Sequence, residues 1–386
     1  MTWPSVQVNQ VNQLQGETKE VERTVLFMGT GNTNVGKTVS VNTQTDFDDV
    51  LGREDSDLKR NVMAAMNNAG QNWSAYLHVL AIDSEPLAFV DAVLAAQDVA
   101  SVEGYVLLTA ASKEVIDAAN TLRETLIAKY GRWVWSIITV DTPTKDESWP
   151  DYVARIIALQ KGIAAPSVQL VPQLWGKEAG VLAGRLCTRS VTIADTPARV
   201  KTGALKDMGA TLPLDGTGKE IDLATLQALE KNRLSVPMWY PDYDGLYWAD
   251  GRTLDVEGGD FQNIENLRIV DKVARNVRIR AIAKIGDRSL NSTPNSIETH
   301  KSYFARVMRE MARSSQINGI TFPGECKPPQ DSDVVITWMS KTKVAVYFVV
   351  RTYECPKGIE ASVILDTSLE GAAWVNGFRV SRLIST

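Results

Sequence analysis

The sequence predicts an α/β domain with a mainly parallel sheet over residues 23–195 and an α+β domain over residues 263–370. In the first range, short apolar stretches alternate with helical patterns of about 10–17 residues, which is typical of a parallel sheet covered by helices. In the second range, two long amphipathic patterns precede stretches that alternate at period two. Residues 196–262 are richer in glycine, proline and turn residues, and we expect a connecting region there.

Each expected strand of the first range is a run of apolar or β-branched residues bounded by polar residues or glycine. The expected helices carry apolar residues at steps of three and four, and some begin at a cap or a proline, as at Asp46 and Pro150. The strands are expected at 24–28, 39–43, 76–82, 105–108, 134–140 and 168–171. The helices are expected at 46–51, 58–70, 86–95, 113–129, 149–162 and 177–186.

The remaining elements follow from the same patterns. We expect a short helix at 223–231 and a hairpin within 243–254. Two longer helices are expected at 264–285 and 296–314, the second with Ser296 or Thr299 as its cap. The expected antiparallel strands are 334–339, 343–351 and 359–365.

Composition excludes several classes of function. The chain has 386 residues, with 41 Lys and Arg against 46 Asp and Glu, so its net charge of -5 disfavours a globally basic nucleic-acid-binding protein. It has three cysteines without a CxxC pair and only two histidines, which disfavours a metal site or a disulfide framework. We expect His78 to be a core residue of a strand and His300 to be solvated on a helix. No apolar run reaches about 18 residues, so we expect neither a membrane span nor a signal peptide, and a reducing cytoplasm is the default compartment.

Residues 31–38 match the nucleotide-binding pattern G-x-x-x-x-G-K-[ST] through Gly31, Gly36, Lys37 and Thr38. A P-loop NTPase would cradle phosphates on the loop amides, with Lys37 reaching the outer phosphates. That chemistry requires a helix to begin at the Lys-Thr pair. Here a β-branched, alternating stretch follows instead, so we interpret the motif as a polar loop between two strands, with no cofactor and no catalytic residue. The enzymatic reading remains the alternative hypothesis, and the conformation of residues 38–45 distinguishes the two.

Several segments in order resemble contractile-tail sheath proteins, the family that forms the outer tube of contractile phage tails and R-type tailocins. Within that family, the sequence most resembles the divergent Mu-like branch. The matching segments are Leu26-Phe27-Met28-Gly29, the acidic-aromatic stretch 43–52, the Asn/Gly-rich turn 67–73, the helix 226–234, the hairpin-like 248–254 and the helix that opens at 266–271. One departure is Asp250-Gly251, where the family has a single glycine.

The resemblance implies a structural subunit and not an enzyme. It implies a homo-oligomer, a helical sheath of stacked rings around an inner tail tube, whose contraction drives the tube through a target cell envelope. Baseplate and tail terminator proteins would be further partners, with no nucleic acid and no membrane span. The protein would be located in the virion tail of a phage or tailocin and would assemble in the host cytoplasm. In these terms residues 23–195 form an outer domain, 196–262 the connecting region and 263–370 the C-terminal sheath domain.

The resemblance also implies that arms at both ends link neighbouring subunits by adding strands to their sheets. Residues 1–22 would be the N-terminal arm and residues 371–386 the C-terminal arm. A disordered N-terminus and an edge strand within the same subunit are the respective alternatives. The residues expected in the linking strands are Val6, Val8, Val11, Leu14, Phe378, Val380 and Leu383.

The helices of the C-terminal region carry an excess of positive charge. Residues 264–316 contain eleven Lys and Arg but five Asp and Glu, whereas the remaining chain is acidic. Arg306, Arg309 and Arg313 share one helix face, opposite a set of apolar residues. We predict that this arginine stripe contacts an acidic surface of the inner tube. A merely solvated basic face is the alternative, and nucleic-acid binding is less favoured because few aromatic residues accompany the stripe.

Overall fold

The computed structural model describes residues 21–365. Of these residues, 21–353 belong to one compact unit and 354–365 belong to a second. The expected linking strands, from Val6 to Leu14 and from Phe378 to Leu383, lie outside the described residues.

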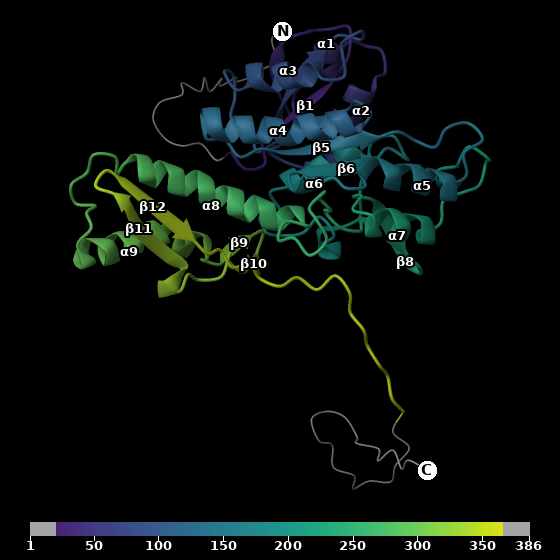
Figure 1. Cartoon of the computed structure of the whole chain (residues 1–386). Coiled ribbons are helices and arrows are strands. Elements are labelled where there is room, and N and C mark those ends of the chain that lie inside the picture. Colours follow the sequence, from purple (N-terminus) through teal and green to yellow (C-terminus); the bar gives the residue numbers. More distant parts are fainter. Residues whose placement is uncertain (1–20, 366–386) are drawn as a thin grey trace, which may run out of the picture. The chain divides into compact units, whose positions relative to one another are not determined.

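A six-stranded sheet is the centre of the first unit (Figure 1). Its strand order is β2-β3-β1-β4-β5-β6, and all neighbouring strands are parallel except β2 and β3. The mainly parallel sheet predicted from the sequence is therefore present. The strands are β1 (Val25–Thr30), β2 (Thr38–Asn42), β3 (Ser74–Leu80), β4 (Gly104–Leu107), β5 (Trp135–Val140) and β6 (Val168–Pro172).

Helices cover both faces of this sheet, because side chains of a strand alternate between its faces. In β1, Leu26 and Met28 point into one core and Val25 and Phe27 into the other. The first core includes residues of α3 (Ala88–Ala96), α4 (Lys113–Tyr130), α5 (Trp149–Gln160) and α7 (Leu223–Lys231). The second includes residues of α1 (Phe47–Leu51), α2 (Asp57–Ala69) and α6 (Glu178–Cys187).

Helices α2 and α6 approach each other unusually closely. The contact is made at Gly180 and Gly184 of α6, which lie against the backbone of α2 at Asn61 and Ala65. The Asn61 side-chain oxygen also accepts a hydrogen bond of 2.8 Å from the Gly180 amide. The two glycines therefore set the distance between the helices on this face of the sheet.

The predicted hairpin at 243–254 is displaced towards the N-terminus. The structure pairs β7 (Pro237–Tyr240) with β8 (Tyr243–Trp248), and Pro241 and Asp242 form the turn. Proline fixes its own φ, and Asp242 adopts a φ of 60°, which a short polar residue tolerates. Residues 249–254 are not available for a hairpin, because Leu254 exchanges backbone hydrogen bonds of 2.8–2.9 Å with Ala165 and Val168.

The C-terminal elements of this unit are two helices and short antiparallel strands. Helix α8 (Ile264–Ile282) is followed by α9 (Pro294–Met311), whose cap is Thr293 and not the expected Ser296 or Thr299. A third core joins α8, α9 and the strand β11 (Val334–Ser340), which pairs with β12 (Lys343–Phe348). The strands β9 (Ser315–Ile317) and β10 (Ile320–Phe322) form a separate hairpin.

The predicted third strand at 359–365 is wrong. Residues 351–365 carry no strand, and the β12 strand ends at Phe348 and not at residue 351. The alternating apolar residues of this segment are exposed, with Val363 98% accessible. A strand needs a hydrogen-bonding neighbour, and the described residues provide none for this segment.

Candidate assembly surfaces

A row of ion pairs joins helix α8 to the α/β layer. Arg268, Asp271 and Arg275 lie at steps of three and four on one face of α8. Arg268 pairs with Glu103 at 2.6 Å and Asp271 with Arg123 at 2.6 Å, while Arg275 pairs with Glu22 at 2.7 Å. Arg268 and Glu103 are both fully buried, at 2% and 0% side-chain exposure. This face of α8 is therefore internal and is not an assembly surface.

The ionisation of Glu103 predicts a dependence of stability on pH. Burial alone would raise the pKa of Glu103, but Arg268, Arg275 and the Arg23 amide hold it at about 2. A carboxyl whose pKa is below its unfolded value of 4.5 stabilises the fold above pH 4.5. We expect this contribution to disappear as the pH falls from about 4.5 to about 2. Urea unfolding of the wild type and of Glu103→Gln tests this, because the difference in their stability should shrink in this window.

These pairs correct the picture of an uncompensated basic region at 264–316. Arg268, Lys272 and Arg275 are neutralised by Glu103, Glu325 and Glu22, all of which lie outside that range. His300 is also not solvated as predicted: it is 4% exposed, and its Nδ1 lies 2.8 Å from the Ser296 carbonyl oxygen. The loop that precedes α9 covers this histidine, and the sequence pattern of the helix alone does not reveal that loop.

Two members of the predicted arginine stripe lie on α9, whereas Arg313 lies beyond the end of this helix, which stops at Met311 and not at the predicted residue 314. Arg306, Arg309 and Arg313 are all exposed, whereas Phe304, Val307, Met308 and Met311 are buried in the third core. The three arginines differ in their surroundings. Arg306 pairs with Glu310 at 2.7 Å, and Arg309 donates to the carbonyl of Ser302.

Glu310 was not anticipated as a member of this surface, although its spacing from Arg306 is a readable i,i+4 pair. Its carboxylate pairs with Arg306 of the same helix and, at 3.1 Å, with Arg280 of α8. The hydrogen bond from Arg306 lowers the pKa of Glu310. The surface is therefore a mixed pattern of charge with an excess of cations, and not a uniform basic stripe.

The sheet of β11 and β12 has only two strands among the described residues, so each strand has one edge without a neighbour. Its inner face packs on α9 through residues such as Ile336 and Val346. Its outer face remains apolar and accessible, with Val335, Met339, Tyr347 and Val349 between 45% and 60% exposed. A two-stranded sheet with an apolar outer face and open edges is a template for additional strands.

Residues 31–38 do not have the geometry of a phosphate-binding loop. Thr38 begins strand β2, which runs antiparallel to β3, so no helix follows the Lys-Thr pair. The Thr38 hydroxyl lies 2.9 Å from Nδ1 of His78, which is buried as predicted, and burial lowers the pKa of this histidine. The conformation of residues 38–42 thus supports the inter-strand loop and not the enzymatic alternative.

We expect Lys37→Ala to leave folding and assembly unchanged, because Lys37 is exposed and makes no ion pair with the described residues. A surface substitution of this kind changes the free energy of unfolding by no more than about 0.5 kcal/mol, so the thermal midpoint should move only slightly. Thermal unfolding and electron microscopy of polymers measure the two properties. Loss of assembly in this variant would show that the loop has a role in the lattice.

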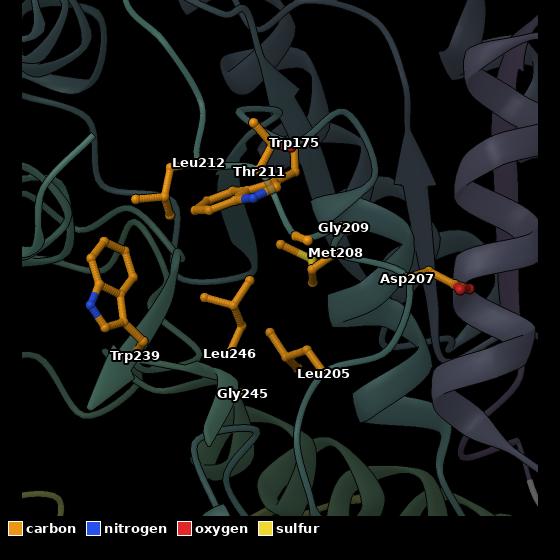
Figure 2. A pocket seen from close by; sticks show the side chains of 11 residues that line it. Trp175, Leu205, Asp207, Met208, Gly209, Thr211, Leu212, Trp239, Gly245 and Leu246 are labelled. Atoms are coloured by element: carbon orange, nitrogen blue, oxygen red, sulfur yellow. The ribbon is translucent and has the colours of Figure 1, made fainter. Parts of the chain in front are cut away.

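An apolar hollow of about 460 Å³ lies between the hairpin β7–β8 and residues 205–212. Figure 2 shows the rings of Trp175 and Trp239 on two sides of it, and Leu246 and Met208 also line it. Its one carboxylate, Asp207, lies at the margin and accepts a hydrogen bond from Asn67. Active-site pockets need converging polar groups, so this hollow is more typical of a protein contact.

In the range 21–365 no group of three or more His, Cys, Asp or Glu side chains is arranged to hold a metal ion. None of the helices in that range is both long and apolar enough to span a bilayer.

The architecture matches solved structures of contractile sheaths. The helical sheath of the anti-feeding prophage in its contracted state aligns over 95% of this chain and 100% of its own, with a TM-score of 0.57 and 13% identity. The sheath tail protein of Desulfitobacterium hafniense aligns over 89% of this chain and 96% of its own, with a TM-score of 0.54 and 9% identity. The fold is therefore that of a contractile sheath protein.

Sequence comparisons then identify the family. Residues 3–252 match the DUF2586 N-terminal domain, and residues 260–368 match the DUF2586 C-terminal domain. A protein of Haemophilus phage HP1 named "Putative tail sheath protein" is 53% identical over 372 residues, which cover 94% of this chain and 98% of that protein. The chain belongs to the DUF2586 family of tail sheath proteins. It is accordingly a structural protein and not an enzyme, as the sequence predicted.

Proposed function

We propose that this chain is the subunit of a contractile phage or tailocin tail sheath, which polymerises helically around an inner tube. Contraction of the lattice would then drive the tube through a target cell envelope. The open, apolar two-stranded sheet of β11 and β12 carries this proposal, because a subunit that must stay linked while its lattice shortens needs connections made by main-chain hydrogen bonds. Contacts that repeat head to tail without closing generate a helical filament.

The strands that complete this sheet would come from neighbouring copies. We assign them to the N-terminal arm, through Val6, Val8, Val11 and Leu14, and to the C-terminal arm, through Phe378, Val380 and Leu383. These seven residues lie outside the described residues, towards the two ends of the chain. Their sequences partly alternate apolar and polar residues, which suits a strand with one face on an apolar sheet.

The remaining parts would have separate roles. The region 23–195 would form the outer domain of the lattice, 196–262 would connect it, and 263–370 would form the sheath domain nearest the tube. The exposed Arg306, Arg309 and Arg313 would face an acidic tube surface. Exposed charge pairs contribute only about 0–1 kcal/mol each, which suits contacts that must break during contraction. Baseplate and terminator proteins would bound the sheath in the virion tail, after assembly in the host cytoplasm.

We expect removal of residues 1–15 to prevent the formation of long polymers while leaving a folded subunit. The three cores of residues 21–365 are formed by residues that this truncation retains. Electron microscopy and sedimentation measure polymerisation, and circular dichroism verifies folding. A generic α/β scaffold would keep its oligomeric state after the same truncation, so polymers of normal length would contradict the proposal.

A further inference from the structure

The guanidinium of Arg185, near the end of α6, is buried without a counter-charge. Arg185 is 7% exposed, and within residues 21–365 its guanidinium donates one hydrogen bond, to the Gly203 carbonyl oxygen at 2.8 Å. No Asp or Glu in this range forms an ion pair with it. Burial and the nearby charge of Arg199 lower the pKa of Arg185 to about 10. A buried cation without a counter-ion is unfavourable, so this position is suited to a carboxylate from another molecule.

Three tyrosines of the hairpin β7–β8 form a cluster beside this guanidinium. The ring centroids of Tyr240, Tyr243 and Tyr247 are 5.6–6.3 Å apart. Burial raises the pKa of Tyr247, and the nearby charge of Arg185 opposes that rise. Tyr240 and Tyr243 are 40% and 54% exposed. Tyrosine and arginine are enriched among the residues that dominate binding energy at protein interfaces, so this cluster is typical of a docking surface.

The apolar hollow beside β7–β8 is continuous with this cluster. Residues 203–205 run along β8, where the Leu205 amide donates to the Leu246 carbonyl oxygen at 2.8 Å. Gly203 of this stretch accepts from Arg185, whereas Leu205 and Leu246 line the hollow (Figure 2). One surface therefore offers an apolar recess with a cation next to it. It fits a loop in which an apolar side chain is followed by a carboxylate.

A loop of this composition follows strand β3. Ile82 is 65% exposed, and Asp83 and Glu85 are exposed and form no ion pair with the part of the chain that the structure describes. Strand β3 lies four strands away from β6 in the sheet, which is about 19 Å at the usual strand spacing. The chain that leads into the hairpin lies beyond β6, since the Ser235 amide donates to the Leu170 carbonyl oxygen at 2.9 Å. The loop and the hairpin therefore lie towards opposite edges of the sheet, where they face different neighbours.

We propose that the loop after β3 of one subunit docks on the hairpin β7–β8 of a second copy. Ile82 enters the hollow, and a carboxylate of Asp83 or Glu85 neutralises Arg185. The contact joins two different surfaces, so it repeats head to tail and extends a helical polymer without closing into a dimer. The inference rests on the proposed function and adds to it a contact that involves neither arm of the chain.

The first experiment removes both carboxylates from the loop, by Asp83→Asn combined with Glu85→Gln. We expect this loop variant to require at least about tenfold more protein for polymerisation, since a charge-assisted hydrogen bond is lost. The control is Asp117→Asn combined with Glu124→Gln on α4, which removes two exposed carboxylates elsewhere. It should raise the required concentration less than about threefold. Sedimentation at a series of protein concentrations measures both.

Arg185→Gln tests the other side of the contact. Urea unfolding should show no loss of stability, because the substitution removes an unpaired buried charge and glutamine can still donate to the Gly203 carbonyl. Polymerisation should weaken as much as in the loop variant. Combining the two should weaken it no further, since both remove the same interaction.

A cysteine pair gives a covalent measure of the same contact. Ile82→Cys is combined with Ala210→Cys, which lies at the hollow, in a Cys355→Ser background that leaves only the two buried native cysteines. Diamide should link polymerised copies into a ladder of covalent oligomers on a denaturing gel. Neither cysteine alone should form this ladder, because each meets the other surface and not its own copy.

The inference fails if the loop variant and its control polymerise alike, or if the cysteine pair forms no ladder in normal polymers. It also fails if the effects of Arg185→Gln and the loop variant add, because they would then belong to different contacts. The loop variant and the cysteine pair decide the question even if Arg185→Gln does not fold. Wild-type protein that forms no polymer would instead overturn the proposed function, so the two failures are distinguishable.

Discussion

Replacing Arg268 by methionine should lower the free energy of unfolding by about 3–5 kcal/mol. Methionine has a similar apolar stem, so the substitution removes the guanidinium and leaves little empty volume. The Glu103 carboxylate would then remain fully buried without the two hydrogen bonds of 2.6 and 2.9 Å that Arg268 donates to it. The Leu186 carbonyl of α6 would also lose a donor at 2.9 Å.

The double variant Glu103→Gln and Arg268→Met separates the cost of an unpaired charge from the value of the pair. A glutamine still accepts the hydrogen bond from the Arg23 amide, and it carries no charge to be buried. The double variant should therefore be more stable than Arg268→Met alone, since the two substitutions are strongly coupled. Urea unfolding of the three variants and the wild type measures this coupling.

An exposed ion pair provides the matched control. Lys301 and Glu298 of α9 are also 2.7 Å apart, but their side chains are 29% and 68% exposed. Lys301→Met should change stability by no more than about 1 kcal/mol. If Arg268→Met also lowered the free energy of unfolding by no more than about 1 kcal/mol, water would have replaced the guanidinium. In that case this pair would not fix α8 to the α/β layer.

The sequence pattern of α8 could not reveal its row of buried ion pairs. Arg268 and Asp271 look like solvated positions on a helix, yet their partners Glu103 and Arg123 are 165 and 148 residues distant in the sequence. By contrast, β1 and β5 were predictable because each is rich in apolar residues and is buried along almost its whole length between two layers of helices. Strand β2 was predictable after the Lys-Thr pair because its residues are β-branched and alternate.

The errors have a common physical origin in long-range partners. Residues 249–254 resemble half of a hairpin, but Leu254 is hydrogen-bonded to residues that flank the start of β6. The apolar alternation at 359–365 resembles a strand, but strand formation needs a partner that the described chain does not supply. For the arginine stripe, the helix pattern correctly indicated exposure, whereas the roles of Glu310, Arg280 and Lys272 required the packing of α8 beside α9.

The second large effect is expected where α6 crosses α2. A Cβ atom at Gly180 would lie 2.0 Å from the Asn61 carbonyl oxygen, and one at Gly184 would lie 2.4 Å from that of Ala65. Both obstacles are backbone atoms of a helix, which cannot rotate away as a side chain can. The helices would have to separate, which would disturb the core that both share with the sheet.

Gly180→Ala should therefore lower the free energy of unfolding by about 2 kcal/mol. Overpacking costs about 1–3 kcal/mol or more, and the better helix propensity of alanine offsets only about 1 kcal/mol of it. Gly180→Val adds two methyl groups at the same contact and should prevent recovery of folded protein. Gly358→Ala is the control, since a Cβ atom there meets nothing within 4 Å. Equal stability of Gly180→Ala and wild type, measured by urea unfolding, would contradict the close approach. Because α6 also presents the Leu186 carbonyl to Arg268, separation of α6 from α2 should weaken the attachment of α8 as well.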